Sequence, residues 1–157
     1  MLQRIQSLFL LFAFIAAVVL FFYPLAGVYA PLATYDLYAY GFKNLSKEPS
    51  IISFMTTFPL LLINILVAAL SIGCIFMYKN RMTQMKIVRL AILLEIVFLA
   101  LVFFVYEKII ETNLQAVYDN IVWKGIYVKL ISMVFLVLAY RWILKDEKLV
   151  RSIDRLR

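Results

Sequence analysis

The sequence is poor in the side chains that most enzymes and metalloproteins use. It contains no histidine, one cysteine, four glycines and nine acidic residues among 157 residues. Soft metals are bound by clusters of Cys and His, so a zinc-type site is not expected. The single Cys74 excludes an intrachain disulfide, and no catalytic Ser/His/Asp or Cys/His set and no glycine-rich phosphate loop is present. We therefore expect neither an enzyme nor a bound metal or cofactor.

Apolar residues are what the sequence has in excess. The chain is 66% hydrophobic and 16% charged, with a mean hydropathy of +0.96, whereas soluble domains are nearer half apolar. Four apolar runs approach the ~20 residues that cross a ~30 Å hydrocarbon core as a helix. They cover residues 8–28, 54–78, 87–106 and 125–142.

These runs predict an all-α fold, because a helix satisfies its own backbone hydrogen bonds in lipid. We expect an integral membrane bundle of four transmembrane helices in a single domain, 1–157. Segments 31–50 and 107–124 would lie on the outer side of the membrane. Residues 143–157 would form an amphipathic helical tail on the cytoplasmic side.

The basic residues predict the orientation, since Lys and Arg favour the cytoplasmic side. Four of them, Lys43, Lys47, Lys108 and Lys124, fall on the outer side, and Lys129 lies inside the fourth run. The other eleven fall on the side of the two termini: Arg4, Lys79, Arg81, Lys86, Arg89, Arg141, Lys145, Lys148, Arg151, Arg155 and Arg157. Both termini are therefore predicted to be cytoplasmic. We interpret the net charge of +7 as a topology signal with attraction to membrane lipids, and expect no nucleic-acid partner.

The first run also has features of a cleavable signal peptide. A basic start and an apolar core precede the sequence VYA at residues 28–30, but Pro31 would follow the cut directly. The sequence PLAGV at residues 24–28 resembles a lipobox with Val in place of the lipidated Cys. We predict a retained first helix, kinked or ended at Pro24.

Three stretches resemble a known family in order and spacing. They are MLQRIQSLFLL at residues 1–11, IFMYKNRMTQMK at 75–86 and KDEKLVRSIDRLR at 145–157. The chain is similar to an uncharacterised family of small four-helix inner-membrane proteins of Bacteroidetes, domain-of-unknown-function family 4293. The resemblance implies four helices and a bacterial inner (cytoplasmic) membrane location. It supplies no activity and no catalytic residues, and an acidic residue at position 95 is not part of the family pattern.

Four polar residues within the apolar runs are the candidate site residues: Glu95, Lys129, Asn64 and Ser71. Glu95 stands among fourteen apolar residues at 90–104. Burying a charge there costs ~2.5–3.5 kcal/mol on insertion scales. Three interpretations remain open: a protonated or hydrogen-bonded structural Glu95, an interhelical contact with Lys129, or a role in handling protons or ions.

The expected positions of these residues along the membrane normal bear on the three interpretations of Glu95. Counted from Arg89 and Lys124, Glu95 and Lys129 differ in height by ~10 Å, so a direct ion pair needs helix tilt or an intervening water. Ser71 is closer to Glu95 in height and is a candidate hydrogen-bond partner. Asn64, nearer the midplane, is typical of a modest interhelical contact.

The tail has one apolar stripe at helical spacing. The stripe consists of Trp142, Leu149, Ile153 and Leu156, with Asp146 interrupting it, and the charges Glu147, Lys148, Arg151, Asp154 and Arg155 lie around the other side. Glu147 and Asp154 are placed to pair with Arg151. The tail is either a solvated extension on the lipid headgroups or a docking helix for a protein partner.

The outer segments are aromatic and amphipathic. The density of Tyr around residues 23–42 is typical of an interfacial belt, and partial alternation from Tyr38 to Phe42 also allows a short hairpin. Helical spacing of four apolar residues predicts a helix in 107–124, with Trp123 and Lys124 at the outer interface. These four are Ile110, Leu114, Val117 and Ile121.

Three function classes are compatible with this organisation. We favour a non-catalytic accessory or scaffold subunit of an inner-membrane complex, docking through apolar helix faces and the tail. The alternative is a small oligomeric transporter or ion- or proton-conducting protein using Glu95, Lys129 and Asn64. A lipid-modifying enzyme would require the outer acids to converge: Asp36, Glu48, Glu107, Glu111 and Asp119. The expected partners are membrane lipids and a larger membrane complex, and a homo-oligomer is possible.

Overall fold

The computed structural model describes residues 2–29, 34–45, 54–77, 80–114 and 121–154. Four helices form its long axis: α1 (Leu2–Phe22), α2 (Phe54–Phe76), α3 (Arg81–Leu101) and α5 (Ile126–Asp154). Each is part of a segment long and apolar enough to cross a membrane. The predicted four-helix bundle is therefore confirmed.

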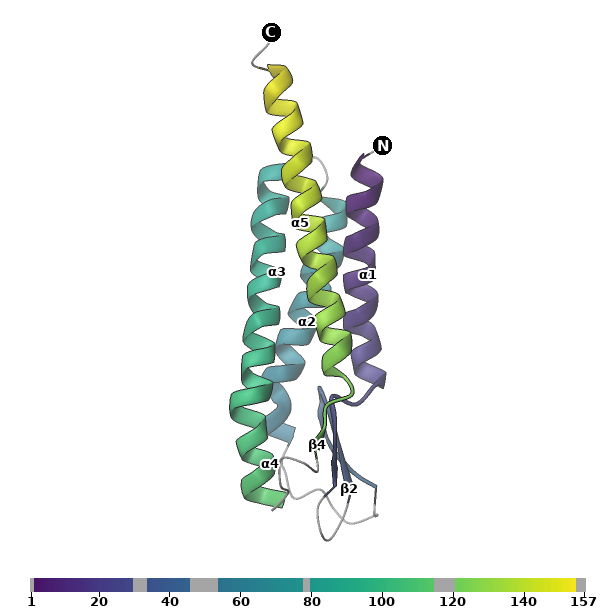
Figure 1. The fold of residues 1–157 in the computed structure, drawn as a ribbon, viewed down its shortest axis with the longest axis vertical. Coiled ribbons are helices and arrows are strands. Elements are labelled where there is room, and N and C mark those ends of the chain that lie inside the picture. The colour runs from purple at the N-terminus through teal and green to yellow at the C-terminus, as the bar shows by residue number, and fades with distance from the viewer. Residues whose placement is uncertain (1, 30–33, 46–53, 78–79, 115–120, 155–157) are drawn as a thin grey trace.

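The helices run up and down, so both termini lie at one end of the bundle (Figure 1). Around the bundle the order is α1, α2, α3, α5, with α5 closing against α1, which is its most extensive neighbour. Figure 1 shows α5 projecting beyond the other helices at the end that carries the termini, which we call the terminal end. Within the described residues, the predicted tail from 143 to 154 is thus the last part of one continuous helix.

Local capping explains why α3 begins earlier than the predicted residue 87. The side chain of Asn80 accepts a hydrogen bond from the backbone N–H of Thr83, which satisfies one of the free donors at the helix start. Gln84 Nε2 donates to the Cys74 carbonyl over 3.0 Å and ties this start to the end of α2. Arg81 and Lys86 therefore belong to the helix, although the predicted third run began only at residue 87.

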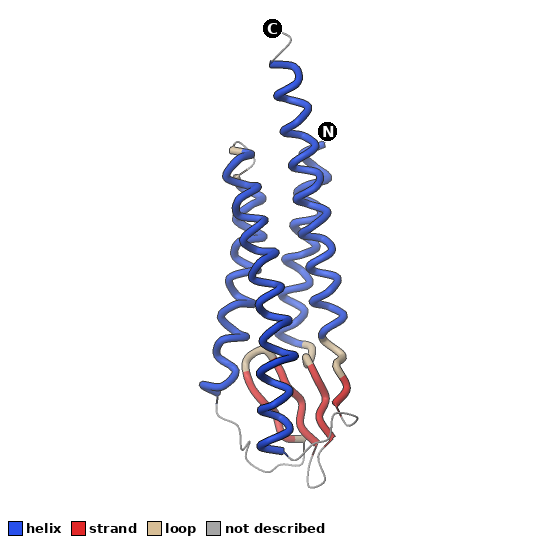
Figure 2. The backbone as a smooth tube through the Cα atoms, turned by 60° about the vertical axis from the view of Figure 1, so that its left-hand side comes forward, coloured by secondary structure: helices blue, strands red, loops and turns tan. Residues whose placement is uncertain are grey.

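The other end of α3 also extends further than predicted. A π-helical turn, η1 (Val102–Tyr106), leads into α4 (Glu107–Leu114). The helix expected in 107–124 is thus present over 107–114, as a continuation of the third membrane helix. Ile121, which was predicted to lie on the same helix, lies on a strand. α4 extends beyond the other helices at the end opposite the termini, as Figure 2 shows.

The outer segments form a small antiparallel sheet at that opposite end, which we call the sheet end (Figure 2). The strands are β1 (Ala26–Tyr29), β2 (Thr34–Tyr38), β3 (Gly41–Asn44) and β4 (Ile121–Val122), in the order β3-β2-β1-β4. The hairpin that alternation allowed is present as β2 and β3. α1 ends at Phe22, just before Pro24, which is one of the two predicted effects of this proline. The predicted bound of residue 28 was wrong, because residues 26–29 pair as a strand.

One face of the sheet joins the apolar core of the bundle. Val28 on β1, Leu37 on β2 and Phe42 on β3 are buried in the same cluster as Ile110 of α4 and Ile126 of α5. The alternation expected of a half-buried strand is seen on β2, where Tyr35 and Leu37 are buried and their neighbours are not. The sheet closes one end of the core.

Gly125 fixes the point at which β4 turns into α5. Its N–H donates to the Leu25 carbonyl over 2.9 Å, and the Leu25 N–H donates to the Leu37 carbonyl over 2.7 Å. A Cβ at Gly125 would lie 2.7 Å from Leu25 Cα and from the Pro24 carbonyl oxygen. Only glycine allows this close approach, which joins the end of α1 to the start of α5.

Candidate functional site: a buried ion pair between two helices

The most polar point in the bundle core is a contact between α3 and α5. Lys129 Nζ lies 3.0 Å from Glu95 Oε2, and the side chains are 1% and 0% exposed. Ser132, three residues after Lys129 on the same face of α5, donates its hydroxyl to Glu95 Oε1 over 2.8 Å. One carboxylate therefore receives two contacts from α5.

An aromatic ring completes the surroundings of Lys129. The ammonium lies 4.2 Å from the centroid of the Phe98 ring, which is three residues after Glu95 on α3. A cation over an aromatic face is attracted by the ring quadrupole, and more strongly where water is absent. We call Glu95, Phe98, Lys129 and Ser132 the Glu95 cluster.

The cluster corrects the predicted heights of Glu95 and Lys129. The difference of ~10 Å assumed that Arg89 marks the membrane surface, but α3 begins eight residues earlier at Arg81. Glu95 is therefore ~21 Å from the start of its helix and near the level of Lys129. No intervening water is needed for the contact, and the interhelical interpretation of Glu95 is the one that the geometry supports.

Ser71 does not have the predicted role of a partner for Glu95. Its hydroxyl donates to the Val67 carbonyl of its own helix over 2.7 Å. Ser132 is the hydrogen-bond partner of Glu95 instead, and it was not among the predicted site residues. Its spacing of three from Lys129 was the available signal, because such residues share a helix face.

Asn64 forms a second polar contact between helices. The side chain is fully buried on α2, and its Nδ2 donates to the Ala17 carbonyl of α1 over 3.1 Å. This contact and the Glu95 cluster lie on different helix pairs. Together they connect all four membrane helices in pairs, α1 with α2 and α3 with α5.

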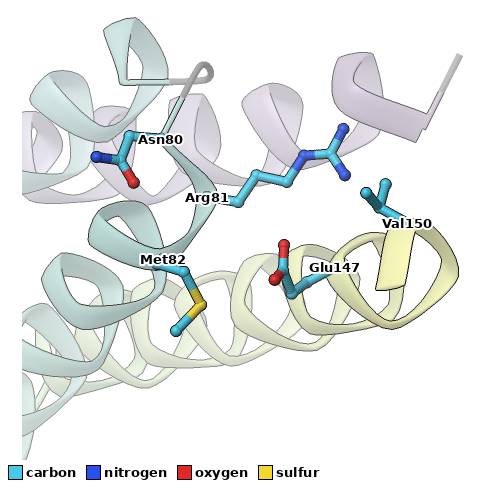
Figure 3. Close-up of a pocket in the computed structure, with 5 residues that line it drawn as sticks. All are labelled: Asn80, Arg81, Met82, Glu147 and Val150. Atoms are coloured by element: carbon cyan, nitrogen blue, oxygen red, sulfur yellow. The ribbon is translucent and has the colours of Figure 1, made fainter. Parts of the chain in front are cut away.

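The terminal end of α5 is held by a third contact. Arg81 Nη2 lies 3.5 Å from Asp146 Oδ2, and Nη1 donates to the Asp146 carbonyl over 3.5 Å. Asp146 interrupts the predicted apolar stripe because it faces the start of α3. Beside this contact is a cavity of about 320 Å³, which Glu147 and Val150 line from α5 and residues 80–82 line from α3 (Figure 3).

Part of the predicted tail stripe lies within the described structure. Trp142 is half-buried, and the Lys145 ammonium lies 5.2 Å from its ring centroid. Leu149 is 44% exposed. The remaining predicted tail residues lie outside the described side chains: Arg151, Ile153, Asp154, Arg155 and Leu156.

Among the described residues, the outer carboxylates do not gather into a metal-type site. Glu48 and Asp119 lie outside them, and the described part of the chain holds no group of three His, Cys, Asp or Glu side chains suited to a metal. Asp36 on β2 stands directly opposite Lys43 on β3. The pKa of the neighbouring Tyr38 is raised, first by its partial burial and then by the nearby Asp36 and Tyr40.

The fold and the core contacts define the class: a multi-pass membrane protein with four helices, capped at one end by a small sheet. The chain belongs to a family described as a domain of unknown function, DUF4293, whose model matches residues 2–156. This confirms the resemblance noted in the sequence. No curated protein and no solved structure matches the chain.

Proposed function

We propose that this protein is a non-catalytic accessory or scaffold subunit of a bacterial inner-membrane complex. The observation that carries the proposal is the use of the intramembrane polar groups. Glu95, Lys129 and Asn64 are all turned to contacts between helices of the same chain. Groups used in this way hold helices at fixed positions, which is what a scaffold requires.

The proposed orientation places both termini in the cytoplasm. Its support is the distribution of Lys and Arg, which gather at the terminal end of the bundle, while few lie at the sheet end. The sheet would then face the periplasm. The last turns of α5 would project from the membrane into the cytoplasm.

These last turns are the proposed docking element. α5 continues to Asp154, beyond the ends of the other helices (Figure 1). Asp146 contacts Arg81, which keeps the start of this projecting part beside α3. Leu149 is exposed on it, and Ile153 and Leu156 follow Leu149 at helical spacing in the sequence. Apolar helix faces inside the membrane offer a second contact area.

The alternative, a transporter or proton-conducting protein using Glu95, Lys129 and Asn64, has less support. Transport requires water or an ion to reach the polar groups, but Glu95 and Lys129 are 0% and 1% exposed and Phe98 lies against the ammonium. Purified protein in vesicles should give the same proton flux as protein-free vesicles. A flux that disappears in Glu95→Gln would overturn the accessory role.

The accessory role is tested by purification of the tagged full-length protein from its own membranes in mild detergent, followed by mass spectrometry and sizing. We expect a stoichiometric partner. Leu149→Gln with Ile153→Gln should release it, if docking uses the tail. The matched control, Lys148→Gln with Ser152→Gln, introduces the same side chains one position earlier, on another face, and should retain the partner. A homogeneous homo-oligomer without a partner would contradict the proposal.

A further inference from the structure

A second cavity lies on α5 near the terminal end, on the side that faces away from the bundle core. It measures about 330 Å³ and is lined by Leu138, Arg141, Trp142 and Lys145. Spacings of three and four residues put these side chains on one helix face. Arg141 and Lys145 are exposed, so two cations stand at the mouth of a cavity with an aromatic wall.

The cavity has a clear polarity along the helix axis. The two cations lie toward the terminal end, and Leu138 lies toward the membrane interior. On the same face, the helix continues inward with Val134 and Ile131, which are 56% and 52% exposed. A strip that is cationic at one end and apolar at the other matches an amphiphile with an anionic headgroup.

The acidic residues of this part of α5 are directed elsewhere. Asp146 contacts Arg81 on α3, and Glu147 lines the separate cavity of Figure 3. The described residues that line the cationic cavity include no acid, and Lys145 is placed over Trp142 at 5.2 Å. Tryptophan with a neighbouring Lys or Arg is the usual composition at the headgroup level of a membrane.

We propose that this cavity binds one anionic phospholipid from the leaflet at the terminal end. The phosphate lies between Arg141 and Lys145, and an acyl chain follows Leu138 and Val134 toward the membrane interior. The ligand class is a membrane lipid with net negative charge. The proposal is independent of the accessory role, because it concerns a single chain in a bilayer.

The test uses Trp142 as a local reporter. The sequence holds two tryptophans, so Trp123→Phe leaves only Trp142. The full-length variant is placed in vesicles of equal parts phosphatidylcholine and phosphatidylglycerol, with bromine on the acyl chains of one lipid at a time. Bromine quenches the indole on contact, so the ratio of quenching gives the relative affinity. A Lys or Arg near an anionic surface is worth about a fivefold preference, and we expect phosphatidylglycerol to be favoured by at least that factor.

Two charge variants separate a site from general attraction. Arg141→Gln with Lys145→Gln should bring the preference close to one. Lys86→Gln with Lys148→Gln removes the same charge from exposed positions at the same end and should keep it. Equal quenching by both lipids in the reporter protein, or equal loss in the two variants, would overturn the proposal. So would competition by inorganic phosphate, which would indicate a soluble anion as the ligand.

Native mass spectrometry of the unmodified chain provides a second readout. Protein released from mixed micelles should retain one phosphatidylglycerol. The Arg141→Gln, Lys145→Gln variant should lose it while eluting at the same size as the wild type. Retention of the lipid by this variant would place the binding elsewhere and contradict the proposal.

Discussion

The two ends of the bundle are held by different kinds of contact. At the sheet end, backbone atoms meet directly: Gly125 bonds to Leu25, and Leu25 bonds to β2. At the terminal end, α5 is held to α3 by the side chains of Arg81 and Asp146, at 3.5 Å and partly exposed. Backbone contacts restrict an element more than a partly exposed ion pair between side chains does, because they leave no rotamer freedom. The sheet end is therefore the fixed end, and the terminal end is the one suited to adjust to a partner.

The Glu95 cluster lies between these ends and is the contact whose loss should have the largest effect. Lys129→Met leaves the Glu95 carboxylate buried without its cation, so the free energy of unfolding should fall by about 3 kcal/mol. Unfolding in mixed micelles, followed by circular dichroism, measures this change.

The control for this variant is Lys108→Met, which replaces an exposed lysine of α4 and should leave stability unchanged. Adding Glu95→Gln to Lys129→Met removes the uncompensated charge and should restore part of the loss. If Lys129→Met alone is as stable as the wild type, the ion pair between Glu95 and Lys129 does not hold α3 to α5.

The fixed character of the sheet end is tested by Gly125→Ala. The added Cβ would meet Leu25 Cα and the Pro24 carbonyl at 2.7 Å, and backbone must move to admit it. We expect a loss of about 2 kcal/mol, the usual size for overpacking, and a decrease of the unfolding midpoint.

Gly73→Ala is the matched control for this glycine, because nothing lies within 4 Å of its Cβ position. Alanine is the better helix former by about 1 kcal/mol, so the control should be neutral or stabilising. If both variants behave alike, the close approach at Gly125 is not what joins α1 to α5.

A smaller effect is expected where α1 meets α2. Asn64→Leu removes the bond to the Ala17 carbonyl, and such bonds in membrane helices are worth about 0.6 kcal/mol. Ser71→Ala removes a bond within one helix and should change stability by less. The same micelle titration, applied to both, ranks them, and the reverse order would contradict an interhelical role for Asn64.

The smallest change in stability is expected at the terminal end. Arg81→Gln breaks a partly exposed pair, worth about 0.5 kcal/mol. Its main effect should be local: the backbone amides of residues 146–150 should exchange hydrogen faster in Arg81→Gln than in the control variant Lys86→Gln. A loss as large as that of Lys129→Met would mean that the terminal end is as firmly fixed as the core.

The membrane spans could be predicted from the sequence, while both limits of the third membrane helix could not. Hydropathy marks where a helix lies in lipid, but it does not count polar turns that belong to the same helix. The start of α3 required the Asn80 cap, and the continuation into α4 required that Ile110 pack into the core. Of the sheet, only the hairpin of β2 and β3 was an alternative, because the strands are short and β1 and β4 pair across distant segments.

Glu95 shows the same division at the level of a single site. Its position within an apolar run predicted burial and a need for a partner. The identity of the partners depended on the true start of α3. Arg89 was assumed to mark the membrane surface, so the helix was predicted to start too late. Once α3 begins at Arg81, Lys129 and Ser132 come within reach of the carboxylate.

Four membrane helices with the cations gathered at one end follow from the sequence, because length, hydropathy and charge are local properties of a segment. The tertiary structure alone decided the order of the helices, the sheet that caps them, the partners of Glu95 and the close approach at Gly125. Each of these depends on the relative positions of residues far apart in the chain, and those positions are set by packing of the whole bundle.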